Sequence, residues 1–192
     1  VRSRGLGDAY KRQAMAGHYE QAGDAAEAIR CLEQAALAAG RLHAHQETIG
    51  YLGRALAQSQ KMPAQNGTEA RLQELLGDSL MARGQHEAAE QAFSAALERR
   101  HAEQRLPRAV LQRKVADSLR ARMVTAQAET AVIQALETLG TLAPDWPAAW
   151  QHAWLDSQLS LMSILYLRGD YHGLAGMTEA VQPTLASIGT AA

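Results

Sequence analysis

The stretch GDSLMARGQHEAAEQAFSAAL, residues 77–97, decides the fold, because the chain repeats it thirty-nine residues later as ADSLRARMVTAQAETAVIQAL, residues 116–136. Ten of the twenty-one positions are identical. Repetition at an interval of roughly 30 to 40 residues is typical of solenoids, in which each supersecondary unit stacks on the next. The repeat therefore favours an array of stacked units over a closed bundle.

The composition favours helices and gives no sign of a membrane or nucleic-acid protein. Alanine supplies 39 of the 192 residues, while aromatic residues make up only 5%. Ala, Leu, Glu, Gln and Arg have high helix propensity, and no long stretch alternates apolar and polar residues as a strand would. The net charge of −1 creates no overall field that would attract nucleic acid. No apolar run approaches the ~20 residues that span a bilayer, so we expect a cytoplasmic protein.

Helix-breaking residues divide the chain into antiparallel pairs joined by short turns. We expect an all-α fold of about nine helices, arranged as a right-handed superhelical array in one domain, residues 1–192, of a longer polypeptide. Asp24 is expected to cap the helix that follows it, with Glu27 at its third position. That helix should close one hairpin and open the next. The expected hairpins therefore overlap at the start, and span residues 8–42, 25–60, 68–101, 107–140 and 146–187.

The residues of the repeat have separate structural roles. Gly77 is expected where the two helices of one hairpin approach most closely, and Gly84 where the turn needs a left-handed residue. Ala89 should be small because the returning helix crosses the first helix there. Phe93 and Ala96 are expected to pack against the following hairpin.

This spacing of Gly, Leu, Gly, Ala, Phe and Ala resembles the tetratricopeptide repeat (TPR). The copy at residues 116–136 departs from the pattern, with Ala116 for the first Gly, Met123 for the turn Gly and Val132 for the aromatic residue. The resemblance implies an α-solenoid whose function is to bind proteins or peptides.

The chain also resembles the helical region of large bacterial regulators. In such proteins a signalling ATPase domain precedes TPR-like repeats, and a nucleotidyl cyclase or DNA-binding domain can be attached. The stretches GHYEQAGDAAEAIRCLEQAA, residues 17–36, and ETIGYLGRALA, residues 47–57, carry this likeness, as does the segment over residues 156–190. It implies a regulatory scaffold within a longer protein.

The first helices of stacked hairpins line the concave face of a solenoid, and that face is the expected partner-binding surface. The partner would be a protein or peptide segment, or a neighbouring domain of the same polypeptide. The side chains expected on this face are Tyr10, Gln13, Glu20, Arg71, Glu74, Asp78, Met81, Arg113, Asp117, Arg120, Asp156, Leu159 and Tyr166.

Two further features stand out, and each has two interpretations. Trp146, Trp150 and Trp154 form one helical stripe, which is either core packing or an aromatic hot spot for binding. Residues 99–122 hold eight of the nineteen cations, which form either a solvated rim or a site for an acidic partner. No aromatic residues interleave with these cations, which argues against nucleic acid.

No pattern in the sequence supports catalysis, a cofactor or a metal site. A phosphate-binding loop and a nucleophile elbow are both absent. His43 and His45 at a helix junction should point apart, so we expect no metal there. Cys31 lies on an apolar helix face and should be a buried thiol. Three functions remain, namely a regulatory segment of a larger ATPase-type protein, a free-standing adaptor, and a helical sensor of a small ligand that uses the Trp stripe.

Overall fold

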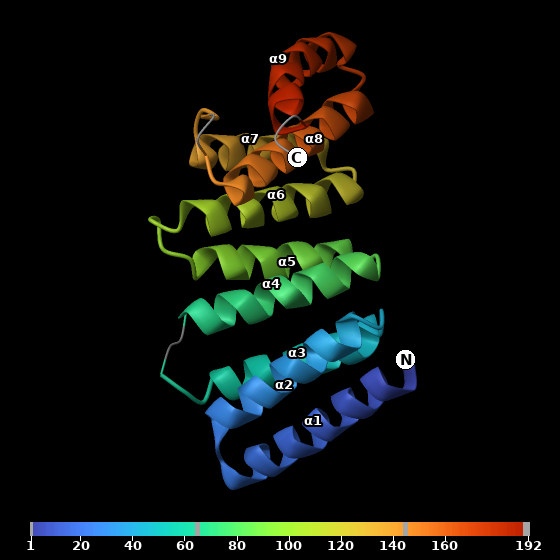
Figure 1. The fold of residues 1–192 in the computed structure, drawn as a ribbon, viewed down its shortest axis with the longest axis vertical. Helices are drawn as coiled ribbons and strands as arrows, with labels where there is room; N and C mark the ends of the chain where they lie inside the picture. The colour runs from blue at the N-terminus through green and yellow to red at the C-terminus, as the bar shows by residue number, and fades with distance from the viewer. Residues whose placement is uncertain (1, 64–65, 144–145, 190–192) are drawn as a thin grey trace. The chain divides into compact units, whose positions relative to one another are not determined.

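The computed structural model describes residues 2–63, 66–143 and 146–189, and every regular element within them is a helix (Figure 1). The described part of the chain contains nine helices, which confirms the expected number. They are α1 (Arg2–Ala22), α2 (Ala25–Gly40), α3 (His45–Ser59), α4 (Asn66–Ala82), α5 (His86–Glu98), α6 (Arg105–Ala121), α7 (Thr125–Leu139), α8 (Ala148–Arg168) and α9 (Tyr171–Gly189). None of these helices combines the length and apolarity needed to cross a membrane. The chain forms two compact units, Val1–His101 and Ala102–Ala192.

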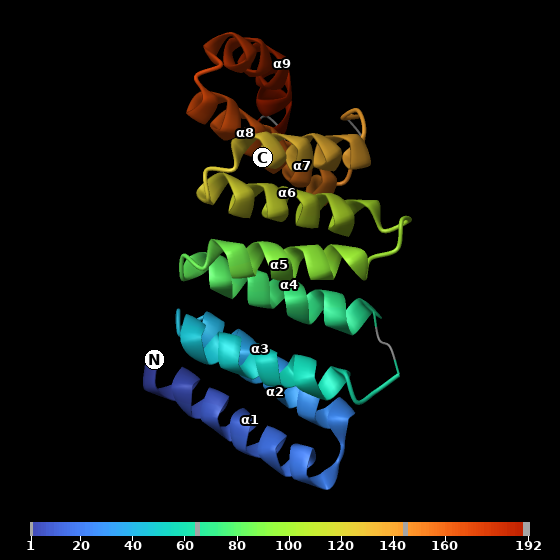
Figure 2. The same ribbon diagram turned by 180° about the vertical axis from the view of Figure 1, so that it is seen from behind.

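In the first unit α2 packs against both α1 and α3, and α4 packs against α3 and α5 (Figures 1 and 2). The core of the first three helices contains Leu32 of α2 and Leu52 of α3, both fully buried, and Cys31 at 2% exposure. One helix thus packs against two neighbours, as expected for a helix shared by two hairpins, and the prediction of a buried thiol is confirmed. Alanine makes this sharing possible, since its small side chain lets α2 approach helices on both sides. The alanines of α2 that are buried are Ala28, Ala35, Ala36 and Ala39.

Helix ends follow the sequence signals. The Asp24 carboxylate accepts a hydrogen bond from the backbone N–H of Glu27 at 3.1 Å, which is the predicted N-cap. Gly84 ends the α4–α5 turn region with a φ of +73°, as predicted. Met123 holds the same left-handed conformation, with a φ of +62°, in the equivalent turn of the second copy. The second copy therefore keeps the turn although it lacks the glycine that adopts such a turn most easily.

The α4–α5 hairpin is built on the contact of Gly77 with Phe93. The Phe93 ring is 1% exposed and lies over Gly77, so that a Cβ at this glycine would come within 2.8 Å of three ring atoms. The close approach at Gly77 is as predicted. The ring packs on its own hairpin, and its expected packing against the following hairpin stays a prediction. The ring needs the space that a residue without a side chain leaves open.

In the second unit α6 and α7 form a hairpin, α8 packs against both, and α9 packs against α8. The core contains Leu119 of α6, Val132 of α7 and Ile164 of α8. Arg105 ties three helices together. It donates hydrogen bonds of 2.9 Å to the backbone oxygens of Thr138 and Leu139, at the end of α7, and its guanidinium lies 5.6 Å from the ring centroid of Trp150 on α8. A cation at the C-terminal end of a helix satisfies carbonyls that have no partner within the helix.

Candidate functional site

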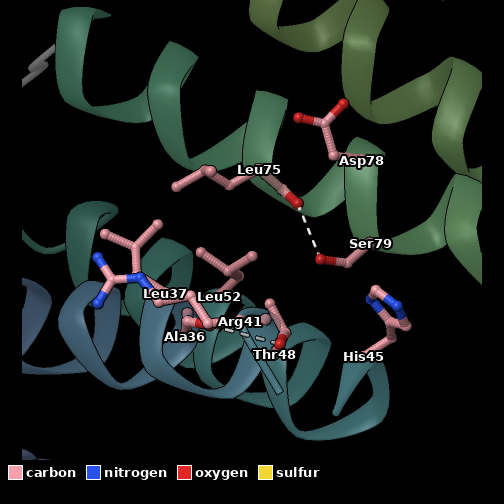
Figure 3. A pocket seen from close by; sticks show the side chains of 10 residues that line it. Ala36, Leu37, Arg41, His45, Thr48, Leu52, Leu75, Asp78 and Ser79 are labelled. Carbon is pink, nitrogen blue, oxygen red and sulfur yellow. Dashed lines mark hydrogen bonds between the residues drawn. The ribbon is translucent and has the colours of Figure 1, made fainter. Parts of the chain in front are cut away.

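The first unit contains an apolar pocket of about 350 Å³ between α2, α3 and α4 (Figure 3). Leu37, Leu52 and Leu75 face this space, each from a different helix. Leu52 is fully buried, whereas Leu37 is 40% exposed and forms part of the pocket edge. The volume falls within the range of about 300–1,000 Å³ that ligand-binding pockets occupy. The other residues that line the pocket are Ala36, Gly40, Arg41, His45, Thr48, Asp78 and Ser79.

Polar groups surround the leucines in a defined arrangement. The hydroxyl of Thr48 donates to the backbone oxygen of Ala44 at 3.0 Å, and that of Ser79 donates to the backbone oxygen of Leu75 at 3.1 Å. Their protons are therefore engaged within helices, and neither hydroxyl is an unpaired donor in an apolar wall. The Arg41 guanidinium lies at one end of the pocket, and Asp78 and His45 lie at the other (Figure 3).

His43 and His45 lie in contact rather than pointing apart. Their ring centroids are 5.9 Å apart, in an edge-to-face arrangement, which corrects the expectation from the sequence. His43 has a φ of +58°, and this left-handed turn brings its ring back toward the start of α3. Within the described residues, no group of three or more His, Cys, Asp or Glu side chains could hold a metal ion.

A second pocket, of about 470 Å³, lies in the second unit between α8 and α9. Two residues of the predicted partner-binding surface, Asp156 and Leu159, line it, and both are exposed. Asp78 lines the first pocket. The structure therefore distributes these three predicted residues over two pockets.

Most other residues of the predicted surface in the first unit link helices to each other. Gln13 accepts a hydrogen bond of 2.9 Å from the Tyr51 hydroxyl, which joins α1 to α3. Glu20 accepts two hydrogen bonds from the Arg54 guanidinium, at 3.3 and 2.6 Å, and this contact lowers the pKa of Glu20 although burial opposes the shift. Arg71 of α4 pairs with Glu33 of α2 at 2.7 Å, and Glu74 pairs with Arg100 at 3.8 Å.

In the second unit Asp117 is the centre of the predicted residues. Its carboxylate accepts a hydrogen bond of 2.6 Å from Arg113 and one of 2.8 Å from the hydroxyl of Ser160, and Arg120 lies 3.9 Å away. Ser160 belongs to α8, so this carboxylate joins α6 to α8.

Met81 is half-buried and Tyr166 is 61% exposed. The side chain of Tyr10 lies outside the described residues. The role of these residues in partner binding stays a prediction.

The three tryptophans pack against the second unit's core while remaining partly exposed. They lie over a cluster that includes Ala109, Ala135 and Leu139. Trp146 and Trp150 meet edge to face with ring centroids 5.4 Å apart, a favoured geometry for aromatic pairs. Core packing thus accounts for their position, and a hot spot among them stays a prediction.

Several of the cations over residues 99–122 are engaged within their own unit. Arg99 pairs with Glu69 at 2.7 Å, Arg113 pairs with Asp117, and Arg105 holds the end of α7. These contacts engage three of the eight cations in links between or within helices, which favours the interpretation of a structural and solvated rim.

Sequence analysis did not find the first pocket. Residues of α2, α3 and α4 line this pocket. A helical pattern in the sequence shows which residues are apolar, but it does not show which of them no neighbouring helix covers. One signal could have pointed to it. Leu37 is a large apolar residue near the end of an alanine-rich helix, one helical turn before the cation Arg41.

Comparisons with known proteins identify the fold alone. No family model and no curated protein matches the chain. A protein of Podosopora anserina described as a kinesin light chain with nearly identical TPR-like repeats matches with a TM-score of 0.66, at 19% identity over 93% of this chain and 95% of that one. A variant of the same protein gives a TM-score of 0.68, at 20% identity over 94% and 96%. BtubC (BKLC) from P. vanneervenii gives 0.56, at 12% identity over 97% and 90%. The chain therefore has a TPR-like helical fold of the α-solenoid class.

Proposed function

We propose that the chain is a protein-interaction module without catalytic activity, and that the pocket between α2, α3 and α4 binds an apolar side chain of a partner segment. The observation that carries this proposal is the set of three leucines facing one cavity, with an open edge at Leu37 (Figure 3). Interfaces derive most of their binding energy from a few apolar anchors that fill such pockets. Polar groups around the cavity would orient the segment.

The charged side chain of Arg41 at one end of the pocket should favour one class of partner segment over others. Arg41 is exposed, and no contact within the described chain pairs it with an acidic group. An acidic residue near the apolar anchor would therefore meet a cation whose charge is not already neutralised. The preferred segment has an apolar residue with an Asp or Glu close to it.

A selection with displayed peptides on the full chain tests this function. We expect Leu37→Glu to weaken binding of the selected peptides at least tenfold, because a charge at the edge would have to be buried with the anchor. Arg41→Glu should remove the preference for acidic residues. Binding is measured by fluorescence anisotropy of labelled peptides.

The matched control is Ile133→Glu, since Ile133 is 39% exposed, close to the 40% of Leu37, and lines neither pocket. This control should leave affinity unchanged. Equal binding to the wild-type and Leu37→Glu proteins would rule out the pocket as the anchor site.

At a finer level, we propose that this module is the regulatory scaffold of a larger bacterial signalling protein of the ATPase type, located in the cytoplasm. The support is the likeness of residues 17–36 and 47–57 to the helical region of such regulators. The alternative is a free-standing adaptor, with which the fold is equally compatible.

The mass of the native polypeptide discriminates between these two proposals. An antibody raised against this chain should detect, on a blot of source cells, a band several-fold larger than 20.7 kDa. A single band close to the mass of this chain would contradict the regulator proposal and favour the adaptor.

A further inference from the structure

The helix α8 has two opposite faces that carry no charged side chain. One face carries Ala153, Ser157, Ser160 and Ile164, all buried, and it packs on α6 and α7. The other face carries Leu155, Leu159, Met162 and Tyr166, which follow the same spacing of 4, 3 and 4 residues. An interior helix in a stack of helices has two such faces, because a neighbour covers each of them.

The second face of α8 is only partly covered by α9. Val181 of α9 is buried against the 470 Å³ pocket that Leu155, Leu159 and Met162 line. Leu159 nevertheless remains 56% exposed and Tyr166 61% exposed. Tyr171, at the start of α9, is 65% exposed and meets Tyr166 edge to face with centroids 6.3 Å apart. The groove that this pocket forms is therefore continued along α8 by exposed apolar side chains.

The lining residues of the groove include one carboxylate, Asp156, and one histidine, His152, but no Lys or Arg. Asp156 is exposed at its edge, and within the described residues no hydrogen bond or ion pair engages its carboxylate. Asp117, in contrast, is held by Arg113 and Ser160. The one cation near the end of α8, Arg168, pairs with Glu129 of α7. The charge of Asp156 is thus left uncompensated beside an apolar surface.

We propose that this groove binds an amphipathic helix of a partner protein, with apolar residues spaced by 3 and 4 and a Lys or Arg opposite Asp156. The face from Leu155 to Tyr166 rises about 16 Å, at about 1.5 Å per residue, which is the length of a three-turn helical contact. A groove between two helices accepts the ridge of a third, and apolar anchors on one face of a helix fit such grooves.

A second copy of this chain is a poorer occupant than a basic helix. In a two-fold dimer the same surface meets itself, so Asp156 of each copy would face a surface that has no Lys or Arg to pair with it. A basic partner helix would instead neutralise this carboxylate where it borders the apolar face.

The test uses the full chain and a displayed library of helix-forming peptides of about 16 residues, because shorter isolated helices are marginal in water. Selected peptides should carry an apolar stripe and a Lys or Arg. Leu159→Glu should weaken their binding at least tenfold, and Asp156→Lys should reverse the charge preference toward Glu. Ile133→Glu serves again as the exposed apolar control, and circular dichroism verifies that each variant is folded.

Three outcomes would overturn the inference. The first is a selection that yields no helical binder, and the second is a set of binders that Leu159→Glu and Asp156→Lys leave unaffected. If such binders respond to Leu37→Glu instead, the proposed function stands and only this inference fails. The third is self-association that Leu159→Glu abolishes, which would assign the groove to a second copy.

Discussion

Replacing Phe93 with alanine is expected to lower the free energy of unfolding by about 3–5 kcal/mol, the usual cost of removing a large aromatic ring from a core. The ring is 1% exposed and lies on Gly77, so few side chains can move in to fill the space. Single domains have a total stability of about 5–15 kcal/mol, and the loss would therefore be a large share of it. Urea unfolding followed by circular dichroism measures the change.

A matched truncation at the surface controls for the loss of a large apolar residue. Ile133→Ala should lower the free energy of unfolding by much less than Phe93→Ala does. Ile133 is 39% exposed, so its truncation leaves no closed cavity. If Phe93→Ala cost no more than this control, the ring could not be packed on Gly77 as described.

Replacing Gly77 with alanine should destabilise the protein by about 1–2 kcal/mol, although the same change in most helices is favourable. Alanine in a helix interior is better than glycine by about 0.5–1 kcal/mol. Here the new Cβ would come within 2.8 Å of three atoms of the Phe93 ring, and overpacking of a core costs about 1–3 kcal/mol. The overlap outweighs the gain in propensity.

The sign should reverse when the ring is absent. In the Phe93→Ala background, Gly77→Ala should stabilise the protein by about 0.5–1 kcal/mol, since only the propensity gain remains. Gly53→Ala on α3 is the control in the wild-type background, because no atom lies within 4 Å of a Cβ built there. Gly53→Ala should therefore stabilise the protein. The same effect of Gly77→Ala in both backgrounds would contradict the contact.

The local features of the fold could be predicted because they depend on residues close in sequence. The Asp24 cap and the Gly84 turn each involve a few neighbouring positions, and the structure has both. The expectation that α2 takes part in two hairpins depends on the spacing of the first two repeat copies, which leaves room for one helix between them and not for two. Met123 shows the limit of such reasoning. The repeat aligns Met123 with the turn glycine Gly84, but the residue type of Met123 does not predict a left-handed backbone conformation.

Packing partners could not be predicted in the same way. The helical period places Phe93 on an apolar face, but it does not say which residue of a neighbouring helix the ring contacts. That contact depends on where a glycine leaves space, and Gly77 provides the space within the same hairpin. The two pockets could not be predicted from the sequence for a related reason. The size of a cavity depends on how completely side chains from separate helices fill the space between them.

The predicted partner-binding residues illustrate how ion pairs limit sequence reasoning. Glu20 and Arg71 were expected on a binding surface because of their positions in the first helices of hairpins. Their partners, Arg54 and Glu33, lie more than thirty residues away in sequence, and only the fold brings each pair to 2.6 or 2.7 Å. Asp156, which no such contact engages in the described part of the chain, is the charged member of that set with the clearest opportunity to meet a partner.

The double use of α2 has a consequence for how this part of the chain fluctuates. Its buried side chains belong to one core that also includes residues of α1 and α3. Unfolding either flanking helix would uncover the same apolar surface of α2 and weaken the remaining hairpin. The three helices should therefore open as one cooperative element, whereas two hairpins with four separate helices could open one at a time.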